Sequence, residues 1–179
     1  MASVTIARPA STEYAPFYGG YVNEVPEGDL LAHLERQGRE TAALLRRITE
    51  AKSQHRYAPG KWTIREVVGH MIDAERVFAY RALSFARGEG AALPSFDENE
   101  WAATSNAGGR TLKELVDEFA VVRAATLALF HGFSDKEFAR SGVASNNHIT
   151  VGAIAYIVAG HEHHHVNILR ERYGVESHS

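Results

Sequence analysis

Along most of the chain, apolar residues recur at spacings of three and four, the pattern of helices that bury one face. Four long segments show this pattern, and we predict helices over residues 29–51, 63–87, 111–132 and 150–174. Two of the predicted starts are threonines followed three residues later by a glutamate, the capping-box signature of a helix N-terminus. The periodicity and the caps together predict four long helices.

The segments before and between these helices break the pattern. Residues 1–27 mix prolines and glycines with aromatic residues, and we predict an extended arm that lies on the helices. Residues 88–110 form a long connection, within which a short helix is expected near 98–103. A serine at position 134 with a glutamate three residues later predicts a short capped turn, and residues 141–149 are interpreted as a polar loop.

No alternation typical of strands competes with the helical periodicity. The chain is therefore expected to be one all-α domain over residues 1–179, an antiparallel four-helix bundle spanning residues 28–175. The extended N-terminal arm over residues 1–27 packs on this bundle. The length of the connection over residues 88–110 predicts at least one long crossover, because a simple up-down-up-down order needs only short loops.

Composition narrows the classes of function. The chain has 179 residues, a net charge of −3 and no cysteine, so disulfides, thiolate zinc sites and a protein thiol nucleophile are all excluded. No cluster of basic residues is present to neutralise phosphates, so we expect no nucleic-acid partner. Neither a membrane-spanning stretch nor a secretory signal is recognised, so no membrane partner is expected and the predicted location is cytoplasmic.

Histidines interrupt the apolar stripes of two predicted helices. His161 and His165 lie four residues apart on the inward face of the last helix, so their Cβ atoms should be about 5–6 Å apart. His70 interrupts the inward face of the second helix in the same way. Buried imidazoles without partners cost free energy, whereas three of them can share one divalent ion with bonds of about 2.0–2.1 Å. We therefore predict a metal site at His70, His161 and His165.

Other residues near these histidines leave alternatives open. His161 and His165 match the metalloprotease pattern H-E-x-x-H, but few ligands follow them in the chain, and Glu162 is either a base, a support for a ligand or a solvated residue. Asp73 either accepts a hydrogen bond from a histidine ring N–H or forms a salt bridge. His163 should point elsewhere, and His164 is a flanking residue or a substitute ligand.

The sequence resembles the DinB-like (DinB/YfiT) superfamily of metal-binding four-helix bundles. The resemblance rests on Tyr14-Ala15-Pro16-Phe17-Tyr18, the run from Tyr57 to Glu66, Gly69-His70 with Asp73-Ala74-Glu75-Arg76, and Gly160-His161-Glu162 through His165 to Leu169. It implies zinc or nickel bound at His70, His161 and His165, and a homodimer. It also implies either transfer of a low-molecular-weight thiol or hydrolysis, and it assigns no catalytic residue beyond the ligands.

Two functions from different classes are therefore considered. The first is a metal-dependent enzyme, a thiol-dependent S-transferase or a hydrolase, that acts on a small-molecule substrate. The alternative is a non-catalytic protein that binds a metal or a small ligand during a stress response. A purely structural ion that holds two helices together is a third interpretation of the same histidines.

Overall fold

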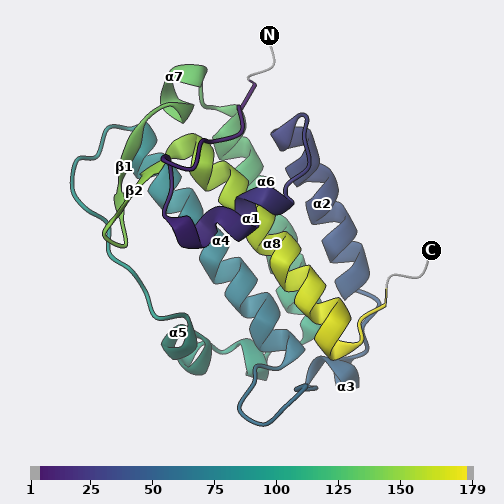
Figure 1. Ribbon diagram of the computed structural model, residues 1–179. Coiled ribbons are helices and arrows are strands. Elements are labelled where there is room, and N and C mark those ends of the chain that lie inside the picture. The colour runs from purple at the N-terminus through teal and green to yellow at the C-terminus, as the bar shows by residue number, and fades with distance from the viewer. Residues whose placement is uncertain (1–4, 177–179) are drawn as a thin grey trace.

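Four long helices form the body of the protein, as predicted. The computed structural model describes residues 5–176, and its long helices are α2 (Leu30–Leu45), α4 (Ile64–Ala86), α6 (Leu112–His131) and α8 (Val151–Tyr173) (Figure 1). Both predicted capping boxes form at α4 and α6, where each threonine accepts from a glutamate N–H and the glutamate reaches back to the threonine N–H. Gly174 ends α8 in the left-handed conformation, with a φ of 61°.

The connection between α4 and α6 crosses the length of the bundle. It includes α5 (Glu98–Thr104) and the short 3-10 helix η2 (Ala107–Gly109), which confirms the predicted short helix. Figure 1 shows that α4 and α6 run upwards while α2 and α8 run downwards. The crossover is therefore confirmed, and because of it α4 and α6 are parallel neighbours. The predicted antiparallel arrangement holds for α4 with α8 and for α2 with α6.

The first predicted helix is shorter than expected. We predicted one helix over residues 29–51, but α2 ends at Leu45 and a separate turn of helix, α3 (Glu50–Ser53), follows. Thr49 starts α3, because its side chain accepts a hydrogen bond from the N–H of Lys52. A threonine side chain that bonds to the nearby backbone in this way competes with a continuing helix.

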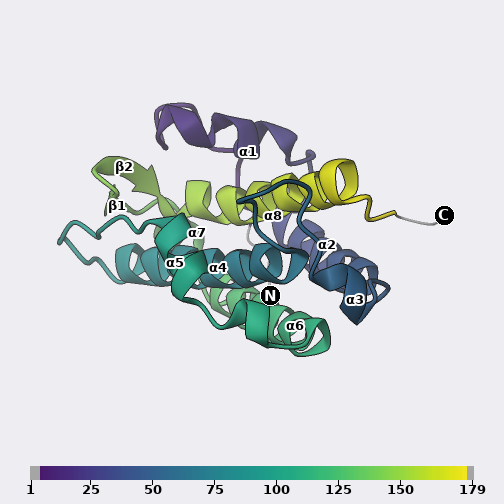
Figure 2. The ribbon, with the colours of Figure 1, turned by 90° about the horizontal axis from the view of Figure 1, so that it is seen from below.

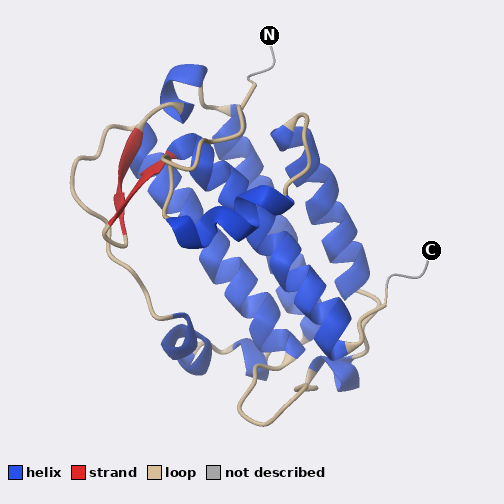
Figure 3. Cartoon of the chain, in the orientation of Figure 1, coloured by secondary structure: helices blue, strands red, loops and turns tan. Residues whose placement is uncertain are grey.

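The segment interpreted as a polar loop is a β-hairpin, so that prediction is wrong. Strands β1 (Ser141–Ala144) and β2 (Asn147–Thr150) pair antiparallel (Figure 3), joined by a two-residue turn with φ values of 51° and 62°. The short helix α7 (Asp135–Phe138) precedes the hairpin and confirms the predicted capped turn. Leu93 from the long connection bonds to the hairpin, its N–H donating to the carbonyl of Val143 at 2.9 Å.

The N-terminal arm lies on the bundle, and its second half is helical. The prediction of an extended arm is corrected by the 3-10 helix η1 (Pro16–Tyr18) and by α1 (Gly19–Glu24), which lies along α8 (Figure 2). Proline at the first position favours a helix start because its φ is already helical. Arg8 holds the two halves together by donating to the carbonyls of Val22 and Val25 at 2.7 and 2.5 Å.

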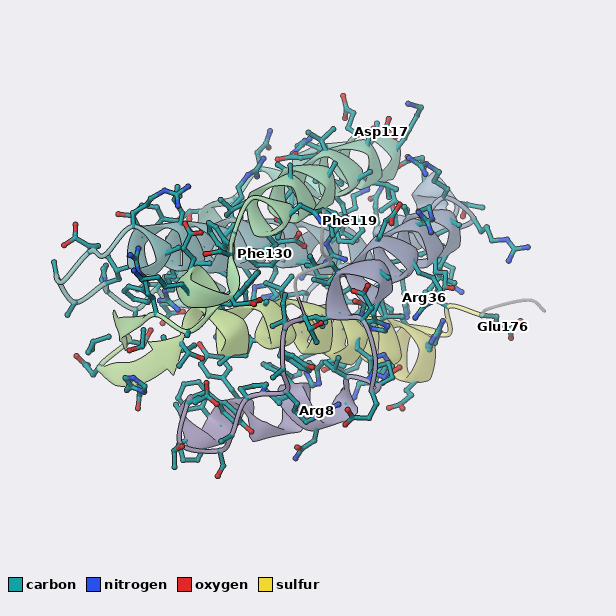
Figure 4. The ribbon with its side chains drawn as sticks, turned by 90° about the horizontal axis from the view of Figure 1, so that it is seen from above. Arg8, Arg36, Asp117, Phe119, Phe130 and Glu176 are labelled. Carbon is teal, nitrogen blue, oxygen red and sulfur yellow. The ribbon has the colours of Figure 1, made fainter. Side chains whose placement is uncertain are left out.

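Two apolar clusters fill the bundle, one towards each end. Phe130 belongs to the cluster beside the hairpin and α1, and Phe119 belongs to the cluster beside α3. In Figure 4 both lie on the inner side of α6, whereas Asp117 lies on its outer side. None of the helices among residues 5–176 is both long enough and apolar enough to cross a bilayer.

Candidate metal centre

Three histidines from two helices meet between the two apolar clusters. His70 of α4 and His161 and His165 of α8 are each only 7–8% exposed. The Nε2 atom of His161 lies 3.0 Å from Nε2 of His70 and 3.1 Å from Nε2 of His165. Possible ligand atoms of all three side chains lie within 4.8 Å of one another. The structure thus brings together the three residues that the periodicity selected.

A glycine precedes the first histidine on each helix, and both glycines admit a close neighbour. A methyl group at Gly69 would lie 2.7 Å from the side chain of Ala107 in η2. One at Gly160 would overlap the backbone of Tyr21 in α1. Because real Cβ atoms do not approach so closely, glycine at these positions lets the two short helices close over the ends of the histidine cluster.

The three imidazoles are neutral at neutral pH. Burial, with a smaller contribution from nearby His164, lowers the pKa of His70 to about 4. Burial is also the largest cause for His161 and His165, and the neighbouring imidazoles add to it, so both pKa values lie well below the ordinary 6.5. Neutral imidazoles have the lone pairs that a metal ion requires.

The donor set fits a divalent ion. In a tetrahedral site with bonds of about 2.0–2.1 Å, two nitrogens are about 3.3 Å apart, which is close to the 3.0 and 3.1 Å observed. The Nε2 atom of His161 has either a proton or a lone pair, so it cannot make ordinary N–H···N hydrogen bonds to both neighbours. A cation would satisfy all three lone pairs at once.

Aromatic rings surround the cluster and limit the movement of the imidazoles. Trp62 packs on His70 with ring centroids 4.9 Å apart. Phe78 and Tyr21 pack edge-on against His161 at 5.7 and 5.6 Å. The cluster is therefore held by rigid neighbours from α4, α1 and the segment before α4.

Glu162 does not belong to this cluster. Its side chain is in the bundle interior on another face of α8, where one oxygen lies 2.6 Å from the guanidinium of Arg123, and the residue is only 2% exposed. Arg123 is also held by Glu75, with contacts of 2.9 and 2.8 Å. The interpretation of Glu162 as a solvated residue is thus wrong, and its pairing with Arg123 gives no support to a role as the base of a protease motif.

The structure also places Asp73, His163 and His164. Asp73 faces Arg76 at 3.9 Å, so of its two alternatives the structure shows the ion pair. His163 lines a separate cavity with His33, away from the cluster, as the helix geometry predicts. His164 is half-buried and stacks at a tilt on Tyr21, with ring centroids 5.3 Å apart, which fits a flanking residue.

Two cavities reach the cluster from different sides. One of about 210 Å³ includes Trp62, Tyr173 and His165 in its lining. The other, of about 380 Å³, is lined by His70, His161 and residues of α1, α4, α5 and the hairpin turn. We call the second one the hairpin cavity. Access from two sides distinguishes this cluster from closed structural sites.

Sequence reasoning missed most of the lining of these cavities. Arg81, Tyr18 and Tyr21 all line the hairpin cavity, and none of them was predicted from the sequence to belong to the site. Arg81 follows His70 by 11 residues, which is about three helical turns and therefore the same face of α4. That spacing is the signal that could have placed Arg81 beside the histidines.

Comparison with known proteins agrees with this architecture. Among solved structures, the chain is similar to YfiT from Bacillus subtilis, described as a probable metal-dependent hydrolase with an unusual four-helix bundle topology. The TM-score is 0.73 and the identity 20%, over 86% of this chain and 93% of YfiT, so the likeness shows a shared fold. No curated protein matches. Residues 33–169, which include α4, α6, most of α8 and all three clustered histidines, match the sequence profile of the DinB superfamily, and the chain belongs to that superfamily.

Proposed function

We propose that this protein is a divalent metal-dependent enzyme that acts on a small molecule, with His70, His161 and His165 as the metal ligands. The observation that carries the proposal is the convergence of three buried, neutral imidazoles whose nearest Nε2 atoms are 3.0 and 3.1 Å apart. Zinc or nickel suits such a set, because imidazole is a good ligand for both.

The chemistry that such an ion supplies is well defined. A divalent ion on three imidazoles has a further position for water or a thiol, lowers the pKa of that group, and stabilises negative charge that develops on the substrate. Because the chain has no cysteine, any sulfur nucleophile comes from a small molecule. Hydrolysis and transfer of a low-molecular-weight thiol are the two reactions that we propose.

Aromatic residues of the chain itself position the imidazoles and limit the access of water to them. Trp62, Phe78 and Tyr21 pack on the imidazoles and fix their rings. The same aromatic rings cover much of the imidazole surface and limit its contact with water, which strengthens electrostatic interactions within the cluster. The two cavities let a substrate approach the imidazoles, which favours an enzyme over a purely structural ion.

Metal analysis tests the ligand assignment. Purified untagged protein is expected to bind about one divalent ion per chain, and His161→Ala is expected to abolish that stoichiometry. His163→Ala is the matched control, because this residue is on the same helix but lines another cavity. Equal loss of metal in both variants would show that the ligands are assigned to the wrong face of α8.

A turnover assay separates the two reactions. Metal-loaded protein is incubated with a nitrophenyl ester and with monochlorobimane, each in the presence and absence of a small thiol. Turnover of the ester without thiol supports hydrolysis, and thiol-dependent turnover supports transfer. Absence of turnover under every condition would count against an enzyme and favour the non-catalytic alternative.

The homodimer stays a prediction, which sedimentation velocity checks.

A further inference from the structure

Arg81 is a buried cation that forms no ion pair with any described residue of the chain. Among residues 5–176 three arginines are buried, and two of them form ion pairs: Arg65 with Glu50 at 2.7 Å and Arg123 with Glu75 at 2.8 Å. Arg81 is only 3% exposed, yet no carboxylate in this range lies within salt-bridge distance of it. Buried charges are almost always paired, because an isolated charge in the interior is costly.

The contacts of Arg81 within the chain are neutral oxygens. Its Nη2 atom donates to the carbonyl of Pro94 at 2.8 Å and to the hydroxyl of Ser145 at 3.0 Å. The Tyr18 hydroxyl lies beside the guanidinium, whose charge partly offsets the rise in Tyr18 pKa that burial causes. These contacts hold the side chain in place, but they leave its positive charge without compensation.

Arg81 lines the same cavity as two of the three clustered histidines. Arg81, His70 and His161 all line the hairpin cavity, whose volume of about 380 Å³ suits a small organic ligand. His70 and Arg81 are three turns apart on α4, about 16 Å along the helix axis. Side chains of a helix lean towards its N-terminus, and His70 lies on that side of Arg81 along α4. Phe78 lies between them on the same face and contacts His161.

We propose that Arg81 binds a carboxylate of the substrate, at the end of the hairpin cavity away from the three imidazoles. The assignment deepens the proposed function, since it identifies the substrate as an organic acid whose reacting group lies at some distance from its carboxylate. In this role Arg81 binds and orients the substrate. The ligand's negative charge supplies the counter-ion that residues 5–176 do not provide.

The surroundings favour a carboxylate over a phosphate. Arginine has a planar fork of N–H donors that matches the two oxygens of a carboxylate. Arg81 is the only cationic side chain that lines the described hairpin cavity, and Glu98 lines it as well. A single positive charge near an acidic residue suits a monoanion better than a dianion. The aromatic walls, Phe17, Tyr18 and Phe96 among them, suit an apolar body.

Calorimetric titration with three related probes tests the assignment. The probes are 4-phenylbutyrate, the uncharged 4-phenylbutanamide and 3-phenylpropylphosphonate, each titrated into wild type, Arg81→Gln and Arg87→Gln. Arg87 is the matched control, because it caps the same helix but its side chain is 58% exposed and pairs with Glu137. Wild type and the control are expected to bind the carboxylate about tenfold more tightly than the amide, and this ratio is expected to fall near one in Arg81→Gln.

Three results would overturn the proposal. They are equal binding of carboxylate and amide to wild type, an unchanged ratio in Arg81→Gln, and Arg81-dependent binding of the phosphonate that is tighter than that of the carboxylate. If Arg81→Gln does not fold, Arg81→Lys identifies the Arg81 Nε–H resonance in arginine-labelled protein. The carboxylate is expected to shift that resonance and the amide is not, and absence of a shift also overturns the proposal.

Titrations of chelator-treated protein keep this proposal separate from the metal-dependent function. The preference for the carboxylate is expected to persist without metal, because it depends on Arg81. If the preference disappears when the metal is removed, the carboxylate binds at the ion, and the Arg81 assignment fails while the metal-dependent function stands. Conversely, protein that binds no metal at all refutes the metal-dependent function and leaves the Arg81 test intact.

Discussion

Acid should destabilise the metal-free protein through its buried histidines. The pKa of His70 is about 4 in the folded chain, mainly because of burial, against an ordinary value of 6.5. Below pH 6.5 the unfolded chain takes up a proton at this imidazole while the folded chain does not. Stability from this group is therefore present above pH 6.5 and is lost as the pH falls towards 4.

The size of the effect follows from the two pKa values. One pKa unit corresponds to about 1.4 kcal/mol, so His70 alone should lower the free energy of unfolding by about 2 kcal/mol between pH 7 and 5, and by about 3 kcal/mol near pH 4. His161 and His165 act in the same direction, because burial also lowers their pKa values. Bound metal should oppose the loss until protons displace it.

Urea denaturation of chelator-treated protein, followed by circular dichroism at several pH values, measures this effect. His70→Gln is the comparison, because glutamine is polar and does not titrate. Between pH 7 and 5 the unfolding free energy of this variant should fall by about 2 kcal/mol less than that of the wild type. The difference can be larger than this, because removal of His70 also relieves one cause of the lowered pKa values of His161 and His165. Identical pH dependence in the two proteins would refute the reasoning.

Two further predictions concern packing and buried charge. Arg123→Met leaves two buried carboxylates without their partner and should cost about 3–5 kcal/mol in urea denaturation, whereas Arg39→Met, in an exposed pair, should cost less than about 1 kcal/mol; similar losses would contradict the burial argument. Gly160→Ala should lower stability by about 1–3 kcal/mol in thermal denaturation, because the methyl group overlaps the backbone of α1. Gly20→Ala meets nothing within 4 Å and is the control, so an equal effect would contradict this packing.

The long helices were predictable because their signals are local. Thr63 and Thr111 mark helix starts by side-chain bonds within four residues, and Gly174 marks an end by its own conformation. The hairpin was not predictable in this way. Its strands have four residues each, and its turn is Ser145-Asn146 rather than a sequence with glycine, so neither alternation nor turn chemistry stands out.

The difference between local and distant signals also explains which residues of the site were predictable. His161 and His165 are close because they are one turn apart on a helix, and His70 lies on an equally apolar stripe, so their inward direction followed from periodicity. Arg81 is buried by groups that lie far from it in sequence, among them Ser145, 64 residues away. No pattern within α4 reveals that distant residues cover Arg81, and an arginine on a helix is ordinarily exposed.

The long helices and the loops beside them contribute different parts of the site, and this has an evolutionary consequence. The imidazoles project from the two most extensively packed helices, whereas Phe96 and Ser145 of the wall facing them come from the connection before α5 and from the turn between β1 and β2. Mutations in those short stretches can reshape the entrance while the packing of the long helices is left untouched. Libraries randomised at positions 94–96 and 145–146 are accordingly the natural starting point for selecting variants with new ligand preferences.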